Sequence, residues 1–131
     1  MKRAVVTGGA GFVGSHIADA LSERGFDVTI FDREQSPWLS RGQKLVRGEI
    51  TDAAQVQGVI EGADVVYHLA ALADLNEGKT KPVETARVNL LGTLNVLEAM
   101  RAHAAKARLM FASTIYVFSR EGGFYRCSKQ A

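Results

Sequence analysis

The chain has 131 residues, of which 47% are apolar and 23% charged, and these proportions are typical of a globular domain with a real core and do not indicate disorder. Sixteen Lys and Arg residues against fourteen Asp and Glu residues leave a net charge of +2, and the scattered basic residues do not form a nucleic-acid-binding stripe. Cys127 is the single cysteine, and no apolar stretch approaches the ~20 residues that span a bilayer, so we expect one cytoplasmic domain that binds neither nucleic acid nor membrane.

Short apolar runs alternate with segments of helical periodicity. We expect strands at residues 3–7, 27–31, 44–47, 64–69 and 108–113. Helices are expected at residues 11–24, 53–61 and 83–103, and residues 33–42 and 73–81 are expected to be irregular. The third helix has a broad apolar face that includes Leu90, Leu94 and Leu97, and Val13 belongs to the apolar stripe of the first. This alternation predicts an α/β fold, a doubly wound parallel sheet of about five strands.

A glycine-rich turn joins the first expected strand to the first helix, with the sequence Thr7-Gly8-Gly9-Ala10-Gly11-Phe12-Val13-Gly14. Gly8 would allow a tight turn, Gly11 would let the backbone approach a pyrophosphate, and Gly14 would let the helix pack closely on its strand. Such turns also serve ordinary strand-to-helix connections. Because this one follows an N-terminal strand and opens a periodic helix, it predicts a site for the phosphates of a dinucleotide in a Rossmann-type sheet.

Asp32 directly follows the second expected strand. A carboxylate there can accept hydrogen bonds from both hydroxyls of a ribose and would repel a 2′-phosphate, which favours NAD over NADP. Arg33 keeps NADP open, because a guanidinium beside the ribose could serve a phosphate. Asp32 could also act only as a cap of the loop.

Tyr125 and Lys129 are four residues apart and share one face of a helix if a helix forms there. A phenol with a pKa near ~10 is a poor base at neutral pH, and a nearby ammonium favours its phenolate. Such pairs also arise by chance, so this pair indicates catalysis only together with the upstream motifs.

His68 stands at the end of an expected buried strand, where a hydrogen-bonded structural histidine is more common than an acid or a metal ligand. No other metal-ligating residues cluster with His68 at metal-ligand spacing, so no metal site is expected.

Together these motifs resemble the N-terminal part of the extended short-chain dehydrogenases/reductases, in the branch of NAD-dependent epimerases and dehydratases that act mainly on nucleotide sugars. The resemblance covers nearly the whole chain, including His68-Leu69-Ala70-Ala71, Asn89 with residues 92–99, and Ser113-Thr114. It implies that Tyr125 exchanges a proton with a substrate oxygen and that Thr114 hydrogen-bonds this oxygen. Lys129 would favour the phenolate and hold the nicotinamide ribose. Ala70 and Ala71 would line the nicotinamide side of the cofactor, and Asn89 would brace the central helix.

The cofactor contacts expected from the motifs and the resemblance come from six parts of the chain and are Gly8, Gly11, Phe12, Val13, Gly14, Asp32, Arg33, Glu49, Ile50, Leu69, Ala70, Ala71, Asn89, Tyr125 and Lys129. The expected catalytic residues are Thr114, Tyr125 and Lys129. Glu49 stands where the family generally has an Asp that contacts adenine, which leaves that contact open, while Ile50 could still pack against the base.

Three features depart from the family pattern near the expected catalytic residues. Val117-Phe118-Ser119 replaces the usual Val-Tyr-Gly, and the stretch from Thr114 to Tyr125 is short. Ile115-Tyr116 follows Thr114 where the sugar dehydratases have acidic residues, which argues against dehydration and leaves epimerisation or carbonyl reduction.

Family members run to roughly twice this length. The resemblance therefore implies that residues 1–131 are an incomplete NAD(P)-binding domain and that a substrate lobe lies beyond Ala131. We expect the cofactor-binding portion of an NAD-dependent nucleotide-sugar epimerase or reductase, inactive by itself and able to form a homodimer through the helix at residues 83–103. The alternative is a non-catalytic dinucleotide-binding module that has lost turnover.

Overall fold

The computed structural model describes all residues from Met1 to Ala131. Five strands form one sheet in the order β3-β2-β1-β4-β5, and they are β1 (Arg3–Thr7), β2 (Asp27–Asp32), β3 (Lys44–Arg47), β4 (Val65–His68) and β5 (Arg108–Phe111). Every neighbouring pair is parallel. The chain leaves β1 toward β3 and then returns to add β4 on the other side of β1, so the strand order reverses between β1 and β4. The expected doubly wound parallel sheet is confirmed.

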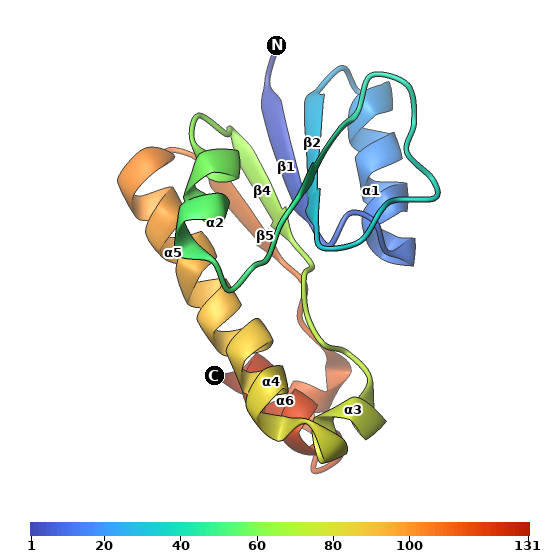
Figure 1. The fold of residues 1–131 in the computed structure, drawn as a ribbon, viewed down its shortest axis with the longest axis vertical. Helices are drawn as coiled ribbons and strands as arrows, with labels where there is room; N and C mark the ends of the chain where they lie inside the picture. Colours follow the sequence, from blue (N-terminus) through green and yellow to red (C-terminus); the bar gives the residue numbers. More distant parts are fainter.

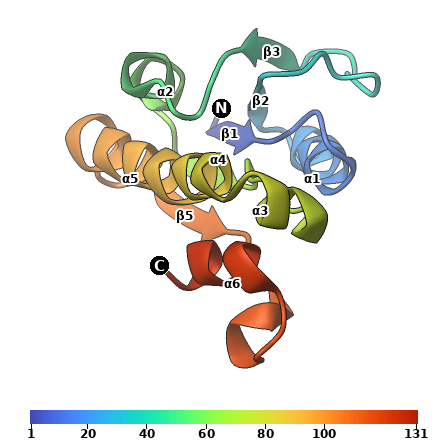
Figure 2. The ribbon, with the colours of Figure 1, turned by 60° about the horizontal axis from the view of Figure 1, so that its bottom comes forward.

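Helices cover both faces of the sheet (Figures 1 and 2). On one face α1 (Phe12–Glu23) packs against β1 and β2. On the other face lie α2 (Ala53–Ile60) and α5 (Gly92–His103), which contact each other. Side chains alternate across β1: Ala4 and Val6 join the core under α1, and Val5 joins the core under α2 and α5. Because both faces are buried, β1 is an unbroken apolar run.

The expected helix at residues 83–103 is a continuous helical rod with a wide turn inside it. The rod begins with α4 (Pro82–Ala86), widens into a π-helical turn over Arg87–Leu91, and continues as α5. At the wide turn the Gly92 amide donates to the Arg87 carbonyl, five residues back. A π-helical turn holds one residue more than an α-helical turn. The spacing of the apolar residues does not reveal it, because the wide turn only rotates the residues that follow it about the helix axis.

The stretch at residues 73–81, expected to be irregular, contains a short helix, α3 (Leu75–Thr80). The Asp74 carboxylate caps it by accepting hydrogen bonds from the amides of Asn76 and Glu77. Its six residues carry no apolar period, so the pattern analysis missed it.

The apolar face expected for the central helix is only partly buried. Leu90, Leu94 and Leu97 remain 37%, 52% and 44% exposed, and the rod instead buries Val88, Val96, Ala99 and Met100. Val13 of α1 is also exposed. The period therefore located the apolar positions correctly, but which of them meet the core depends on where α2 and the sheet lie.

Beyond the carboxyl ends of the strands, α3, α4 and α6 (Gly123–Gln130) gather at one end of the molecule (Figure 1). A 3-10 turn over Ile115–Phe118 links β5 to α6. No helix here combines the length and the apolar character that crossing a bilayer requires.

Candidate functional site

A cavity of about 240 Å3 lies at the carboxyl ends of the strands, where the strand order reverses. Open α/β sheets place their ligands at such switch points. The lining comes from the glycine turn, the end of β2, the segments after β3 and β4, and the wide helical turn, and it consists of Gly8, Gly11, Phe31, Asp32, Arg33, Gly48, Glu49, Ile50, Leu69, Ala70, Ala71, Leu72 and Val88. Of the expected cofactor contacts, the lining does not include Phe12, Val13, Gly14, Asn89, Tyr125 and Lys129.

Backbone contacts explain two glycines of the turn. Gly8 has φ +71°, and a Cβ added there would lie 2.8 Å from the Ala70 nitrogen. A Cβ added at Gly14 would collide with the Gly8 carbonyl oxygen and stand 2.8 Å from the Gly9 Cα. At Gly11 an added Cβ would meet only the Gly8 oxygen, at 3.3 Å, so the backbone of Gly11 is open toward the cavity.

The turn also presents free backbone amides. The first backbone hydrogen bond of α1 is donated by Ser15 to the Gly11 carbonyl, so the amides of Phe12, Val13 and Gly14 have no partner within the helix. No side chain caps this helix end. Phe12 and Val13, whose side chains point to solvent, would therefore contribute amides to a bound phosphate at the positive end of the helix dipole.

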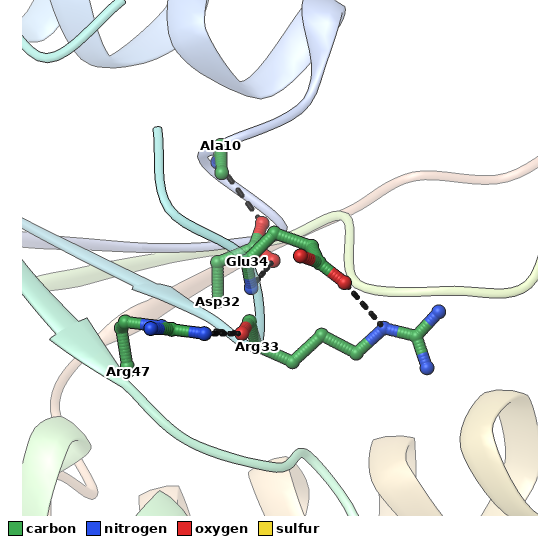
Figure 3. Close-up of polar contacts among 5 residues, drawn as sticks. All are labelled: Ala10, Asp32, Arg33, Glu34 and Arg47. Carbon is green, nitrogen blue, oxygen red and sulfur yellow. Dashed lines mark hydrogen bonds and ion pairs between the residues drawn. The ribbon is translucent and has the colours of Figure 1, made fainter. Parts of the chain in front are cut away.

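Asp32 ties the glycine turn to the loop after β2. One carboxylate oxygen accepts a hydrogen bond from the Ala10 amide at 3.0 Å, and the other accepts from the Glu34 amide at 2.9 Å (Figure 3). The loop-cap interpretation of Asp32 therefore describes a real contact. It does not exclude ribose binding, because each carboxylate oxygen has a second lone pair.

Arg33 lies at the edge of the cavity beside Asp32. Its Nε is 3.8 Å from the Glu34 carboxylate, and its carbonyl accepts hydrogen bonds from the Arg47 guanidinium (Figure 3). The Arg33–Glu34 ion pair is exposed and therefore weak. The Arg33 side chain extends away from the Asp32 carboxylate, so the two residues do not neutralise each other.

The lining residues that the sequence analysis missed are Phe31, Gly48, Leu72 and Val88. Gly48 carried a usable signal, since it stands between a strand end and Glu49. A Cβ there would lie 2.6 Å from both the Gln55 side-chain oxygen and the Phe31 ring. Leu72 and Val88 carried none, because the loop after β4 and the wide helical turn meet only in the folded chain.

The side chain of Asn89 holds the loop after β4 against the wide helical turn. Its side-chain oxygen accepts from the Leu72 amide at 2.8 Å, and its side-chain nitrogen donates to the Leu72 carbonyl at 3.0 Å. The same nitrogen donates to the Ser128 hydroxyl at 2.8 Å, which links the central helix to α6. These contacts agree with a bracing role for Asn89, although its side chain does not line the cavity.

The helix α6 holds Tyr125 and Lys129 against the segment that carries Thr114. Lys129 donates to the Ala112 carbonyl at 2.9 Å, and its ammonium lies 4.7 Å from the centre of the Phe111 ring. Burial lowers the pKa of Lys129 below its ordinary value. The Thr114 hydroxyl accepts from the Tyr116 amide, and the Tyr116 ring stands edge-on to the Tyr125 ring, with ring centres 6.3 Å apart.

A comparison with known protein families matches the part of the chain that contains most of these site residues. The profile described as the NAD dependent epimerase/dehydratase family matches residues 4–128. The chain belongs to the NAD-dependent epimerase/dehydratase family. The resemblance predicted from the motifs is therefore confirmed.

Known proteins similar to this chain differ in the activities that their names state. UDP-N-acetyl-alpha-D-glucosaminuronate decarboxylase from Bacillus cytotoxicus is 36% identical over 125 residues, which are 91% of this chain and 38% of the relative. A 3-beta-hydroxysteroid dehydrogenase from Mycolicibacterium neoaurum is 42% identical over 105 residues, which are 76% of this chain and 28% of the relative. The solved structure of UDP-glucose 4-epimerase from Thermus thermophilus in complex with NAD is 34% identical with a TM-score of 0.84, over 97% of this chain and 47% of that one. The chain thus spans less than half of each of these proteins.

Proposed function

We propose that this chain is the NAD-binding part of an enzyme that epimerises or reduces a nucleotide sugar. The observation that carries the proposal is the convergence of Gly8 and Gly11 of the glycine turn and the Asp32 carboxylate on one cavity at the switch point, next to the free amides at the start of α1. Similarity to a UDP-sugar decarboxylase and a UDP-glucose epimerase supports the substrate class. In this proposal residues 1–131 are the cofactor-binding domain, and a separate lobe binds the sugar.

The cavity and the start of α1 beside it fit a dinucleotide. The amides of Phe12, Val13 and Gly14 would hold the pyrophosphate, Asp32 would bind the adenosine ribose, and Ile50 would pack against the adenine. Ala70 and Ala71 would lie along the nicotinamide. When bound, the nicotinamide supplies hydride exchange with a substrate carbon.

Proton transfer is the task of the chain's own residues. Tyr125 would exchange a proton with a substrate hydroxyl, and Thr114 would donate a hydrogen bond to the same oxygen. Lys129 would favour the phenolate form of Tyr125. The Ala112 carbonyl and the face of the Phe111 ring favour the ammonium that this role requires, against the burial that lowers the pKa of Lys129.

The proposed cofactor is NAD, because Asp32 places a negative charge in the cavity that would repel a 2′-phosphate. Calorimetric titration with NADH and with NADPH tests this choice. We expect NADH to bind more tightly, and Asp32→Ala to weaken NADH more than NADPH. Equal affinities in the wild type, or an unchanged preference in the variant, would remove the role of Asp32.

A non-catalytic nucleotide-binding module is the second candidate. In its favour, Thr114, Tyr125 and Lys129 do not line the cavity, and Ile115 and Phe118 are 81% and 91% exposed beside them. Turnover of UDP-sugars by a protein in which this chain is joined to the proposed sugar-binding lobe, with a 3β-hydroxysteroid included because of the steroid relative, separates the candidates. Turnover that is lost in Tyr125→Phe supports an enzyme, NADH binding without turnover supports a module, and turnover of the steroid alone contradicts the nucleotide-sugar assignment.

The exposed leucines of the central helix, Leu90, Leu94 and Leu97, support a homodimer through this face. Sedimentation equilibrium of the wild type and of Leu94→Glu tests it. A dimer that Leu94→Glu dissociates is expected, and a wild-type monomer at high concentration would contradict it.

A further inference from the structure

His68 is buried at the carboxyl end of β4, and both of its ring nitrogens have a partner. Its Nδ1 lies 2.7 Å from the Thr7 hydroxyl oxygen and its Nε2 lies 2.9 Å from the Thr93 hydroxyl oxygen. His68 is 1% exposed and Thr7 is fully buried, so water does not compete for the His68–Thr7 contact, while Thr93 is partly exposed. The three side chains come from β4, β1 and α5, which are far apart in sequence.

The partners of the two hydroxyls determine where the ring proton lies. The Thr93 hydroxyl donates its single hydrogen to the Asn89 carbonyl at 2.6 Å, because a carbonyl can only accept. Toward His68 the Thr93 oxygen is therefore an acceptor, and the proton of the neutral ring must be on Nε2. Nδ1 is then an acceptor, and the Thr7 hydroxyl donates to it.

The Thr7 oxygen is fully used on its other side. It accepts from the amides of Leu69 and Ala70, both at 3.2 Å, so an amide faces each of its two lone pairs, and the Leu69 amide also donates to the Thr7 carbonyl at 3.1 Å. A proton added to Nδ1 would find no lone pair on Thr7. Burial, and next the charge of Lys129, lower the pKa of His68 to about 4, in agreement with a ring held neutral.

The resulting chain of hydrogen bonds connects the two walls of the candidate site. At one end are the Leu69 and Ala70 amides, whose residues line the cavity and whose backbone meets Gly8 of the glycine turn. At the other end is Asn89 in the wide helical turn, whose side chain continues to Ser128, and Ser128 donates to the Tyr125 carbonyl at 2.7 Å.

We infer that His68 is a positioning residue of the candidate site: a neutral imidazole protonated on Nε2, it joins Thr7 to Thr93 and thereby fixes the Leu69–Ala70 backbone relative to the central helix and α6. His68 does not line the cavity, so its ring would act through other residues and not by contact with the cofactor. This inference depends on the proposed function, since the backbone that His68 fixes is the proposed nicotinamide-side wall.

The first test is the ring itself. Imidazole nitrogen resonances of the 15N-labelled wild type are expected to show His68 as a neutral ring protonated on Nε2, with no change between about pH 8 and about pH 5.5, as for a buried ring with a lowered pKa. The Nδ1-protonated form, averaging between the two forms, or titration with an ordinary pKa would overturn the inference. This measurement needs no ligand and no variant.

The second test is NADH affinity by calorimetry in His68→Phe, His68→Asn and Thr7→Val, for protein whose circular dichroism is that of the wild type. His68→Phe and Thr7→Val should each weaken NADH binding about tenfold. Combining the two substitutions should weaken binding little further, because both residues belong to the same series of hydrogen bonds. His68→Asn can keep the acceptor for Thr7 but not the bond to Thr93, so it should recover only part of the affinity. Thr29→Val is the matched control, since Thr29 is also buried, in β2, but takes no part in the hydrogen bonds around His68. This variant should bind NADH as the wild type does.

The outcomes separate the two claims. Wild-type protein that fails to bind NADH contradicts the proposed function and with it the role of His68 there. Wild-type binding with equal affinities in His68→Phe, Thr7→Val and Thr29→Val overturns the inference alone. If His68→Phe and Thr7→Val fail to fold, the ring tautomer and the NADH affinity of His68→Asn test the inference. A ring protonated on Nδ1, or a His68→Asn variant that binds NADH as tightly as the wild type, would then overturn it.

Discussion

Replacing Gly14 by Ala tests the contact that seats α1 on the glycine turn. The added Cβ would lie 2.8 Å from the Gly9 Cα and 3.0 Å from the Gly8 carbonyl carbon, and it would collide with the Gly8 oxygen. Ordinary carbon contacts are about 3.5–4.0 Å. All of these neighbours are backbone atoms, so no side chain can rotate away, and the turn must separate from the helix.

The expected loss of stability combines two opposing terms. Alanine gains up to about 1 kcal/mol over glycine from helix propensity, whereas forcing an extra methyl into a packed site costs about 1–3 kcal/mol and more where backbone must move. We therefore expect Gly14→Ala to lower the free energy of unfolding by about 1–2 kcal/mol and the melting temperature by roughly 4–8 °C. Urea and thermal unfolding followed by circular dichroism measure both quantities.

Gly58→Ala is the matched control, because Gly58 also lies within a helix and an added Cβ there meets nothing within 4 Å. It should stabilise the protein by about 0.5–1 kcal/mol. If Gly14→Ala were as stable as Gly58→Ala, the close contact between turn and helix described above would be wrong.

Three further predictions use unfolding in urea. Asp32→Asn should cost about 1–3 kcal/mol, because its new amide must face either the Ala10 or the Glu34 amide, and an unchanged midpoint would contradict the two contacts of Asp32. The neutral His68 contributes stability that is complete above the ordinary pKa of 6.5 and is lost as the pH falls toward about 4, a loss of about 3 kcal/mol that His68→Asn should lack. A wild type and a His68→Asn variant with the same pH dependence would refute this. Asp52→Ala should cost about 1 kcal/mol, since Asp52 caps α2 by accepting from Gln55 at 3.1 Å, and Asp52→Ser should recover most of it; equal losses in the two variants would argue against the cap.

The strands could be predicted because each is a short apolar run that is bounded by polar or glycine residues. The expected strand at residues 27–31 extends by one residue to Asp32, and the one at 64–69 shortens to Val65–His68. The wide turn at Arg87–Leu91 could not be predicted, because it shifts the helix by one residue without changing which residues are apolar. The exposure of Leu94 depends on which neighbours cover the helix, which is a property of the tertiary structure.

The candidate site also contains residues that could be predicted from the sequence and residues that could not. Gly8, Gly14 and Asp32 are recognisable from local spacing, because the turn and the strand end that they occupy are formed by neighbouring residues. Leu72 and Val88 both line the cavity, where the side chain of Asn89 holds the Leu72 backbone beside the wide helical turn, a contact between residues 17 positions apart. The direction of the hydrogen bonds around His68 likewise depends on three elements that meet only in the folded chain.

Binding of NADH to the cavity is the central claim, and calorimetric titration of the folded chain tests it most directly. We predict saturable binding at a single site, displaced by NAD and weakened in Gly14→Ala and Asp32→Ala. A folded wild-type chain that gives no heat of binding at millimolar NADH would contradict the assignment of the glycine turn and Asp32 to a dinucleotide.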